Sequence, residues 1–289
     1  MDPTRGLSQT QIVEDPVLKV LLDGRKLFDG GIGVYTRNCV CGLLAAGHFV
    51  GLIISSDDLE RAREEKLPWL DVVATHVDDA SKYSLDEYLG LARRVPVHAY
   101  DVYHSPHYTL PYGIQIPTVV TVHDIIHITH PERRFYPFIA RRLISSALKR
   151  ASAVVTVSNA SAQELRREFG PLVSNKLAVI PNTVPGGVGP MPAVESPETP
   201  FFLSVFSTLK EHKGFEDLLG AYANYVSREG DESLPLVLVG QGFTDPQDAY
   251  GRITAFNLGT KVHVLGTVSD EKLQTLYAQA RAVVLLSLI

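Results

Sequence analysis

The stretch TVVTVHDIIHITHPE, residues 118–132, places a β-branched run directly before a group of histidines. On a helix, His123 and His127 would share one face and could bind a metal, with Asp124 as a third ligand. The run TVVTV favours a strand instead, and Pro131 follows soon after it. The sequence therefore predicts a buried strand with His123 and Asp124 at its carboxyl end, and no metal site. The alternative is a structural role, such as hydrogen bonds that fix the next loop.

Apolar runs of the same kind recur on both sides of this stretch. Continuous Val, Leu and Ile predict strands buried on both faces, and hence a parallel sheet. Helical patterns lie between them, over residues 137–150 and after a capping box at Ser161–Glu164. The alternation predicts a doubly wound, Rossmann-like α/β domain over residues 1–184. Its further strands are KVLLDG (19–24), FVGLIIS (49–55), DVYHS (101–105), AVVTVS (153–158) and KLAVIPN (176–182).

A second domain of the same kind is expected over residues 201–289. It follows PGGVGPMPAVESPETP (185–200), which is rich in proline and glycine and predicts a linker. Ser269 is the expected N-cap of a helix near its end. The sequence stops directly after a strand, so this second parallel-sheet domain is expected to be incomplete. Its strands are FFLSVF (201–206), LPLVLVG (234–240), VHVLG (262–266) and AVVLLS (282–287).

Charge and cysteine content exclude several classes of protein. The net charge of −5 argues against binding to nucleic acid. Cys39 and Cys41 are spaced for neither a zinc knuckle nor a structural disulfide, which indicates a reduced, cytoplasmic protein. Residues 1–16 are polar, unlike a signal peptide. No apolar run reaches the length of about 18 residues that a membrane-spanning helix needs.

A glycine cluster follows the first strand, which is expected to end at Asp23. Gly30, Gly31 and Gly33 open a helix that is expected to begin near Val34. Glycines let a backbone approach a ligand closely, and a helix N-terminus favours phosphate or another electron-rich group. The spacing matches neither the dinucleotide fingerprint nor a P-loop. A tight strand-to-helix turn is the structural alternative.

Two further polar groups follow predicted strands. His104 and His107, in HSPH, are expected to border the same crevice as His123. Lys213 lies between a strand that ends at Phe206 and an amphipathic helix, and could reach an anion between the domains. A solvated lysine is the alternative, although a helix start slightly disfavours a cation.

The segment 133–150 is strongly basic. Arg142 and Lys149 are seven residues apart and share a helix face, which could contact anionic lipid headgroups. That reading predicts peripheral attachment to the inner face of the membrane, whereas a solvated basic face is the alternative. The cations are Arg133, Arg134, Arg141, Arg142, Lys149 and Arg150.

Taken together, these motifs resemble the retaining glycosyltransferases of family four, in an order that covers nearly the whole chain. The resemblance implies the GT-B fold, in which two Rossmann-like domains face each other. The residues that carry it are LDGRKLFDGGIGVYTRNCVCGL, DVYHSPHYTLP, PTVVTVHDIIH, AVVTVSNASAQEL, LAVIPNTV, FFLSVFSTLKEHKGFEDLLGAY, LVLVGQG and VHVLGTVSDEKLQTLYAQARAVVLLSL.

The resemblance also implies roles for individual residues. His123 would face the transferred sugar, with Asp124 beside it as a second catalytic candidate, and Lys213 would bind the donor diphosphate. Many relatives carry an arginine where this chain has Thr208. The sequence has no Asp-x-Asp motif, which agrees with a site that uses neither metal nor other cofactor. The remaining candidates are Gly30, Gly31 and Gly33 beside the donor phosphates and acceptor, Gly240 and Gly242 on the nucleotide side, and His104 and His107 on the acceptor side.

The implied reaction moves a hexosyl group, with mannosyl as one candidate, from a GDP- or UDP-linked sugar to a glycan or lipid-linked acceptor. The family's acidic motif, two glutamates separated by seven residues, is expected beyond Ile289, so these 289 residues alone are expected to lack transfer activity. The alternatives are a truncated, non-catalytic homologue that keeps the acceptor-side domain and a sugar-nucleotide epimerase on the same fold.

Overall fold

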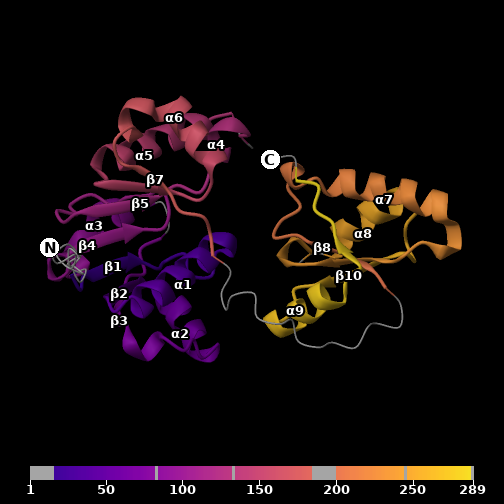
Figure 1. Ribbon diagram of the computed structural model, residues 1–289, viewed down its shortest axis with the longest axis horizontal. Coiled ribbons are helices and arrows are strands. Elements are labelled where there is room, and N and C mark those ends of the chain that lie inside the picture. Colours follow the sequence, from indigo (N-terminus) through magenta and orange to yellow (C-terminus); the bar gives the residue numbers. More distant parts are fainter. Residues whose placement is uncertain (1–15, 82–83, 132–133, 184–199, 244–245, 288–289) are drawn as a thin grey trace, which may run out of the picture. The chain divides into compact units, whose positions relative to one another are not determined.

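The computed structural model describes residues 16–81, 84–131, 134–183, 200–243 and 246–287 (Figure 1). The chain divides into two compact units, Met1–Pro185 and Gly186–Ile289. Of the expected linker 185–200, only Pro200 lies within the described residues, and the domain boundaries remain predictions. Each unit is built around a parallel sheet.

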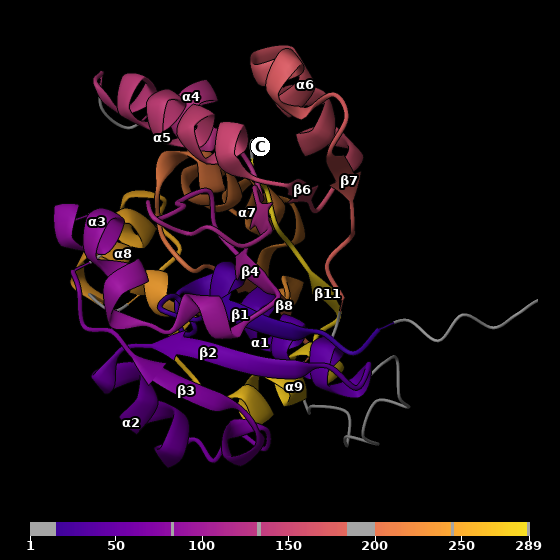
Figure 2. The same cartoon turned by 90° about the vertical axis from the view of Figure 1, so that its left-hand side faces the viewer.

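The first unit contains a seven-stranded, fully parallel sheet with the order β3-β2-β1-β4-β5-β6-β7 (Figures 1 and 2). The strand order reverses between β1 and β4, which are direct neighbours. In open parallel sheets, ligands bind beyond the carboxyl ends of the strands at such a reversal. The strands are β1 (Lys19–Asp23), β2 (Phe49–Ile54), β3 (Ala74–Val77), β4 (Val102–Ser105), β5 (Thr118–Thr121), β6 (Ala153–Thr156) and β7 (Leu177–Val179).

Helices cover both faces of this sheet, because neighbouring residues of each strand point to opposite sides. Leu22 and Leu52 pack into one core with Trp69, whereas Leu21 and Ile53 pack into the other; all four strand residues are fully buried. The helices are α1 (Gly30–Ala45), α2 (Ser56–Glu64), α3 (Leu85–Arg94), α4 (Ile126–Thr129), α5 (Tyr136–Arg150) and α6 (Asn159–Val173), with the 3₁₀ turns η1 (Leu70–Val72) and η2 (Val97–Ala99).

The second unit has a smaller parallel sheet of four strands, in the order β10-β9-β8-β11. Its strands are β8 (Phe202–Val205), β9 (Leu236–Val239), β10 (Val262–Gly266) and β11 (Ala282–Val283). The helices are α7 (Phe215–Glu229), α8 (Pro246–Ala255) and α9 (Asp270–Gln279), and the 3₁₀ turns are η3 (Glu211–Lys213), η4 (Gly230–Glu232) and η5 (Gln241–Phe243).

The fold class predicted from the sequence is confirmed: both sheets are parallel and wound with helices, and the second is smaller. The predicted cap at Ser269 is also present, since its hydroxyl accepts the Lys272 N–H. The predicted strand AVVLLS contributes β11, which has two residues, lies at the edge of the described sheet and leaves Val283 43% exposed.

Two local predictions are wrong. Helix α1 begins at Gly30 rather than near Val34, because the Gly33 N–H already bonds to the Asp29 carbonyl. Helix α6 is capped by Ser158, whose hydroxyl accepts the Ser161 N–H, so Ser161 lies inside the first turn. His127 lies in the short helix α4.

Candidate functional site

His123 lies two residues beyond the end of β5, between α1 and the segment after β4. Its Nε2 is 2.9 Å from the Pro106 carbonyl oxygen, and its ring meets the edge of Tyr35 at a centroid distance of 4.8 Å. A carbonyl can only accept, so Nε2 carries the proton and Nδ1 is left as an acceptor. Burial lowers the pKa of His123, partly offset by the bond to Pro106 and by nearby Asp124. The ring is therefore neutral at pH 7.

His104 and Tyr35 meet at the hydroxyl of Thr121, the last residue of β5. His104 Nε2 lies 2.9 Å from the Thr121 oxygen, and the Tyr35 hydroxyl lies 3.0 Å from it. Burial, reinforced by nearby His123, lowers the pKa of His104 to about 4. This three-residue arrangement joins α1, β4 and β5 just below His123.

His107 and Asp124, two other predicted site residues, make mainly local contacts. His107 is buried, stacks on Tyr108 at 3.9 Å, and has its pKa held well below the ordinary value by burial. It lines a small recess at the carboxyl end of β1 together with Lys26. Asp124 is exposed, and its carboxylate accepts the Ile126 N–H at 3.1 Å. Asp124 therefore holds the start of α4, whereas His107 lines the recess at the carboxyl end of β1.

The three glycines in the first turn of α1 differ in their backbone conformation and in what surrounds them. Gly30 has a φ of +49°, which favours glycine. A Cβ on Gly33 would lie 2.4 Å from the Leu27 carbonyl oxygen, so Gly33 is needed for packing. A Cβ on Gly31 would meet nothing within 4 Å. A Cβ on Gly30 would also meet nothing, so Gly31 is the one of the three that has open space without a positive φ, at the N-terminus of a 16-residue helix.

A buried ionic cluster lies at the carboxyl end of β1, where the strand order reverses. Arg25 is 6% exposed and contacts Asp23 at 2.6 Å, Asp78 at 3.2 Å and Glu87 at 3.3 Å. The Tyr103 hydroxyl donates to Asp23 at 2.8 Å. Burial alone would raise the pKa of Asp23, but Arg25 and Tyr103 together lower it below its ordinary value. The cluster fixes the segment that leads from β1 into α1.

Sequence reasoning missed this cluster, and the reason is the distance along the chain. Asp23 and Arg25 were visible as charged residues after a strand, but Tyr103 is 80 positions from Asp23 and Asp78 is 53 positions from Arg25. A second cation, Arg94, contacts Asp78 at 2.6 Å. An aspartate and an arginine directly after a buried strand were the available signal.

In the second unit, the predicted donor-side residues follow β8 and β9. The Gly242 N–H donates to the Phe206 carbonyl at 3.1 Å, so the two loops are joined. Gly240 has a φ of +128°, and a Cβ there would lie 2.1 Å from the same carbonyl oxygen. Thr208 is half-buried beside Gly242. The structure thus places Thr208, Gly240 and Gly242 together at the carboxyl ends of neighbouring strands.

Lys213 ends the 3₁₀ turn η3 in the loop after β8. It is half-buried, and none of the acidic residues in the described part of the chain pairs with it. Gly214 follows with a φ of +64°, and a Cβ on it would lie 1.9 Å from the Leu286 carbonyl oxygen. Helix α7 begins directly afterwards. A lysine without an acidic partner at a helix start is suited to an anionic ligand.

Three expectations concern metals, membranes and the basic segment. Within the described ranges, no three His, Cys, Asp or Glu side chains are placed to hold a metal ion. None of the helices that the structure describes is long and apolar enough to cross a bilayer. Residues 136–150 of the basic segment form α5, and Arg133 lies outside the described residues.

Solved structures share this architecture over almost the whole chain. Sucrose-phosphate synthase from Thermosynechococcus elongatus aligns with a TM-score of 0.64 and 17% identity, covering 93% of this chain and 75% of that one. HepE from Anabaena, in complex with UDP and glucose, aligns with a TM-score of 0.65 and 20% identity, covering 93% of this chain and 74% of that one. WaaG, a glycosyltransferase of lipopolysaccharide biosynthesis, gives 0.62 and 14%, covering 93% and 75%. No curated protein matches the sequence.

The fold is thus that of GT-B glycosyltransferases. Residues 29–185 match the domain described as Glycosyltransferase Family 4, and residues 191–289 match Glycosyl transferases group 1. The chain belongs to glycosyltransferase family 4, whose members transfer a sugar from a nucleotide sugar. The resemblance seen in the sequence motifs is therefore confirmed.

The buried histidines make the stability of the protein sensitive to acid. The pKa of His104 is about 4 in the folded chain and 6.5 unfolded, so the unfolded state binds more protons between these values. The contribution of neutral His104 to the free energy of unfolding should therefore be fully present above pH 6.5. It should be lost as the pH drops toward 4. Urea unfolding at a series of pH values measures this slope. His104→Gln should reduce the slope, while His130→Gln, at an exposed position, should leave it unchanged.

Proposed function

We propose that this enzyme transfers a hexosyl group, with mannosyl as the first candidate, from a GDP- or UDP-linked sugar to a glycan or lipid-linked acceptor. The observation that carries the proposal is the neutral His123 beside the glycine-opened start of α1. Its Nε2 is committed to the Pro106 carbonyl, which leaves Nδ1 to accept a hydrogen bond from a sugar hydroxyl. His123 is then the residue that orients the transferred sugar, with Asp124 holding the loop behind it.

The donor diphosphate is assigned to the loops of the second unit. Lys213 supplies the positive charge. Gly240 and Gly242, which pack against the backbone of the loop after β8, are assigned to the nucleotide side. A lysine near the leaving diphosphate stabilises the charge that develops as the glycosidic bond breaks. Thr208 offers only a hydroxyl at the position where many relatives carry an arginine, so Lys213 is the main cation. In the first unit, we assign Gly30, Gly31 and Gly33 to ligand binding at the start of α1, and His104 and His107 to the acceptor side.

The proposal is tested with the 289-residue chain and with the same chain extended by a relative's C-terminal segment. Each is incubated with a panel of GDP- and UDP-linked hexoses, with and without glycan and lipid-linked acceptors. Transfer that requires an acceptor and retains the anomeric configuration of the donor would support it. Epimerised free sugar and free nucleotide, released at the same rate without any acceptor, would instead identify an epimerase. Binding of nucleotide without turnover of any donor would identify a non-catalytic homologue.

Alanine substitutions at Gly31 and Gly33 should separate ligand binding from folding. Gly31→Ala should keep the free energy of unfolding, because its Cβ has open space and alanine favours a helix. Its methyl group would stand where a ligand approaches α1 and should lower kcat/KM by roughly tenfold to a hundredfold. Gly33→Ala should instead destabilise the fold, because its Cβ would lie 2.4 Å from the Leu27 oxygen. Unchanged activity in a stable Gly31→Ala variant would refute this role for Gly31.

A further inference from the structure

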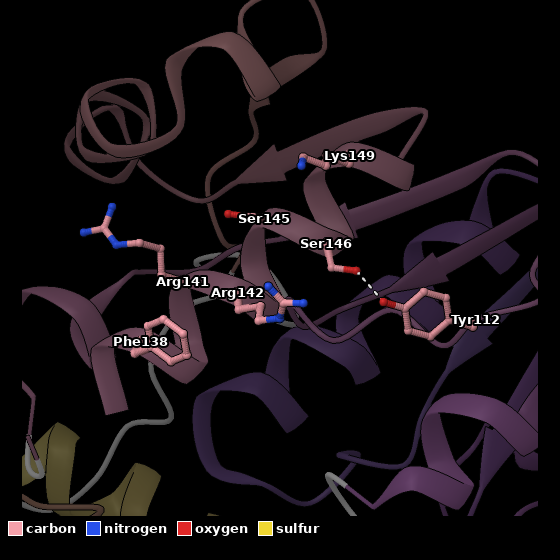
Figure 3. A pocket seen from close by; sticks show the side chains of 7 residues that line it. All are labelled: Tyr112, Phe138, Arg141, Arg142, Ser145, Ser146 and Lys149. Carbon is pink, nitrogen blue, oxygen red and sulfur yellow. Dashed lines mark hydrogen bonds between the residues drawn. The ribbon is translucent and has the colours of Figure 1, made fainter. Parts of the chain in front are cut away.

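Helix α5 carries a hollow of about 400 Å³ on its outer side (Figure 3). The hollow runs along the helix, between Phe138 at one end and Lys149 at the other, with Tyr112 as the opposite wall. The Tyr112 hydroxyl lies 3.1 Å from the Ser146 hydroxyl. The guanidinium of Arg150 stacks on the Tyr112 ring at 4.2 Å and donates to the carbonyls of Leu110 and Pro111. The wall of the hollow is therefore held rigidly against the helix.

The charged side chains that line this hollow are all positive. Helix α5 has the sequence YPFIARRLISSALKR, which contains four cations and no carboxylate, although the whole chain has a net charge of −5. Arg141 is paired with Glu168 at 2.7 Å and points away from Tyr112 (Figure 3). Arg142 and Lys149, in contrast, have no ion-pair partner among the described residues and are exposed. The hollow thus presents two positive charges to an external anion.

Large apolar side chains stand in the open at the N-terminal end of the same helix. Phe135 is 76% exposed, Phe138 is 73% exposed and Ile139 is 54% exposed. Isolated exposed apolar residues are ordinary, but three of them within five positions, next to unpaired cations, form a mixed apolar and basic surface. A soluble acidic partner would account for the cations and leave these aromatic rings in water. A bilayer with anionic headgroups accounts for both.

We propose that α5 docks on an anionic phospholipid bilayer. Arg142 and Lys149 bind lipid phosphates, with the hydroxyls of Ser145 and Ser146 as further hydrogen-bond donors. Phe135, Phe138 and Ile139 enter the boundary between headgroups and acyl chains. The purpose of this surface rests on the lipid-linked acceptor of the proposed function, since docking would bring such an acceptor to the enzyme. Binding itself is measurable without any transfer.

The test uses the full chain and sedimented vesicles of phosphatidylcholine, alone or mixed with phosphatidylglycerol. The protein should bind the mixed vesicles, and binding should weaken with salt. Arg142→Gln/Lys149→Gln should weaken binding roughly 20- to 30-fold, from about 1 kcal/mol for each cation near an anionic surface. The control Arg63→Gln/Arg228→Gln has the same net charge as the test variant but changes exposed cations on α2 and α7. Its vesicle binding should stay near that of the parent protein. Equal losses in the two double variants would overturn the proposal.

A second readout reports whether the apolar end inserts. Trp69 is 6% exposed and is the only tryptophan, so Phe138→Trp adds one exposed indole. Its fluorescence should shift to shorter wavelength with mixed vesicles and stay unchanged with inorganic phosphate. An unchanged spectrum with mixed vesicles, or a phosphate effect without vesicle binding, would refute docking. GDP and UDP binding, measured on the same proteins, separates the docking surface from the proposed function. Loss of vesicle binding with intact nucleotide binding would refute only the docking surface. Loss of nucleotide binding with intact vesicle binding would refute only the proposed function.

Discussion

An Arg25→Met variant should lose about 3–5 kcal/mol of unfolding free energy, the cost of removing one partner from a buried ionic group. Arg25 is 6% exposed and contacts Asp23, Asp78 and Glu87. Without it, Asp23 and Glu87 would lose this cation in a buried site, where a charge that has lost its counter-ion is strongly unfavourable, while Asp78 would keep Arg94. Methionine fills a similar space with an apolar chain, so the loss would report charge rather than a cavity. Urea unfolding at neutral pH measures it.

The matched control is Arg61→Met on α2. Arg61 contacts Glu65 at 2.7 Å, nearly the same distance as Arg25 to Asp23, but its side chain is 51% exposed. Exposed pairs of this kind contribute only about 0–1 kcal/mol. The prediction is therefore a large difference between two ion pairs of equal length. Losses of similar size in the two variants would show that burial does not make the cluster at Arg25 special.

Lys213→Ala should weaken binding of GDP or UDP by about 1–3 kcal/mol, the range for a hydrogen bond to a charged group, which is roughly 5- to 150-fold in Kd. Lys213 lies half-buried at the end of η3, without an acidic partner in the described part of the chain. With Thr208 where relatives often have an arginine, no second strong cation of that kind compensates. Titration calorimetry with each nucleotide diphosphate measures the change, and transfer should fall at least in proportion.

Lys210→Ala is the matched control for this loop. Lys210 lies three positions before Lys213 and is exposed. Lys210→Ala therefore has the same net charge as Lys213→Ala but keeps the lysine at the helix start. Its nucleotide affinity should stay close to that of the parent chain. If Lys210→Ala and Lys213→Ala weakened binding equally, the effect would come from the general charge of the loop, and a specific role for Lys213 would be wrong.

The sequence contained enough local information to predict most of the sheet framework. Continuous apolar runs such as LVLV in β9 are buried, and their uninterrupted apolar composition distinguishes them from loops. Strand β3 was not predicted, because ATHV is mostly exposed and lies within a charged region. The start of α6 was misplaced because Ser158 and Ser161 are three residues apart and either could cap a helix. Only the hydrogen bond from the Ser161 N–H to the Ser158 hydroxyl decides between them.

Site residues could be predicted where one strand end carried the signal, and not where distant segments combine. His123 follows a β-branched run, so its place beyond β5 was visible in the sequence. Its bond to the Pro106 carbonyl, which fixes the tautomer, depends on the neighbouring strand β4. The Tyr35–Thr121 contact joins residues 86 positions apart. Such pairings arise from the strand order of the sheet and from the packing of α1 against it, which no local pattern encodes.

Lys213 and Gly214 would look alike in a deep mutational scan scored by activity alone. Every side chain at Gly214 would begin with a Cβ placed 1.9 Å from the Leu286 carbonyl oxygen, at a φ of +64°, so its variants should vanish from the pool of folded protein. Variants at Lys213 should remain abundant in that pool and fail only when nucleotide is required. Scoring abundance and activity separately would thus divide two adjacent intolerant positions into one that the fold needs and one that the chemistry needs.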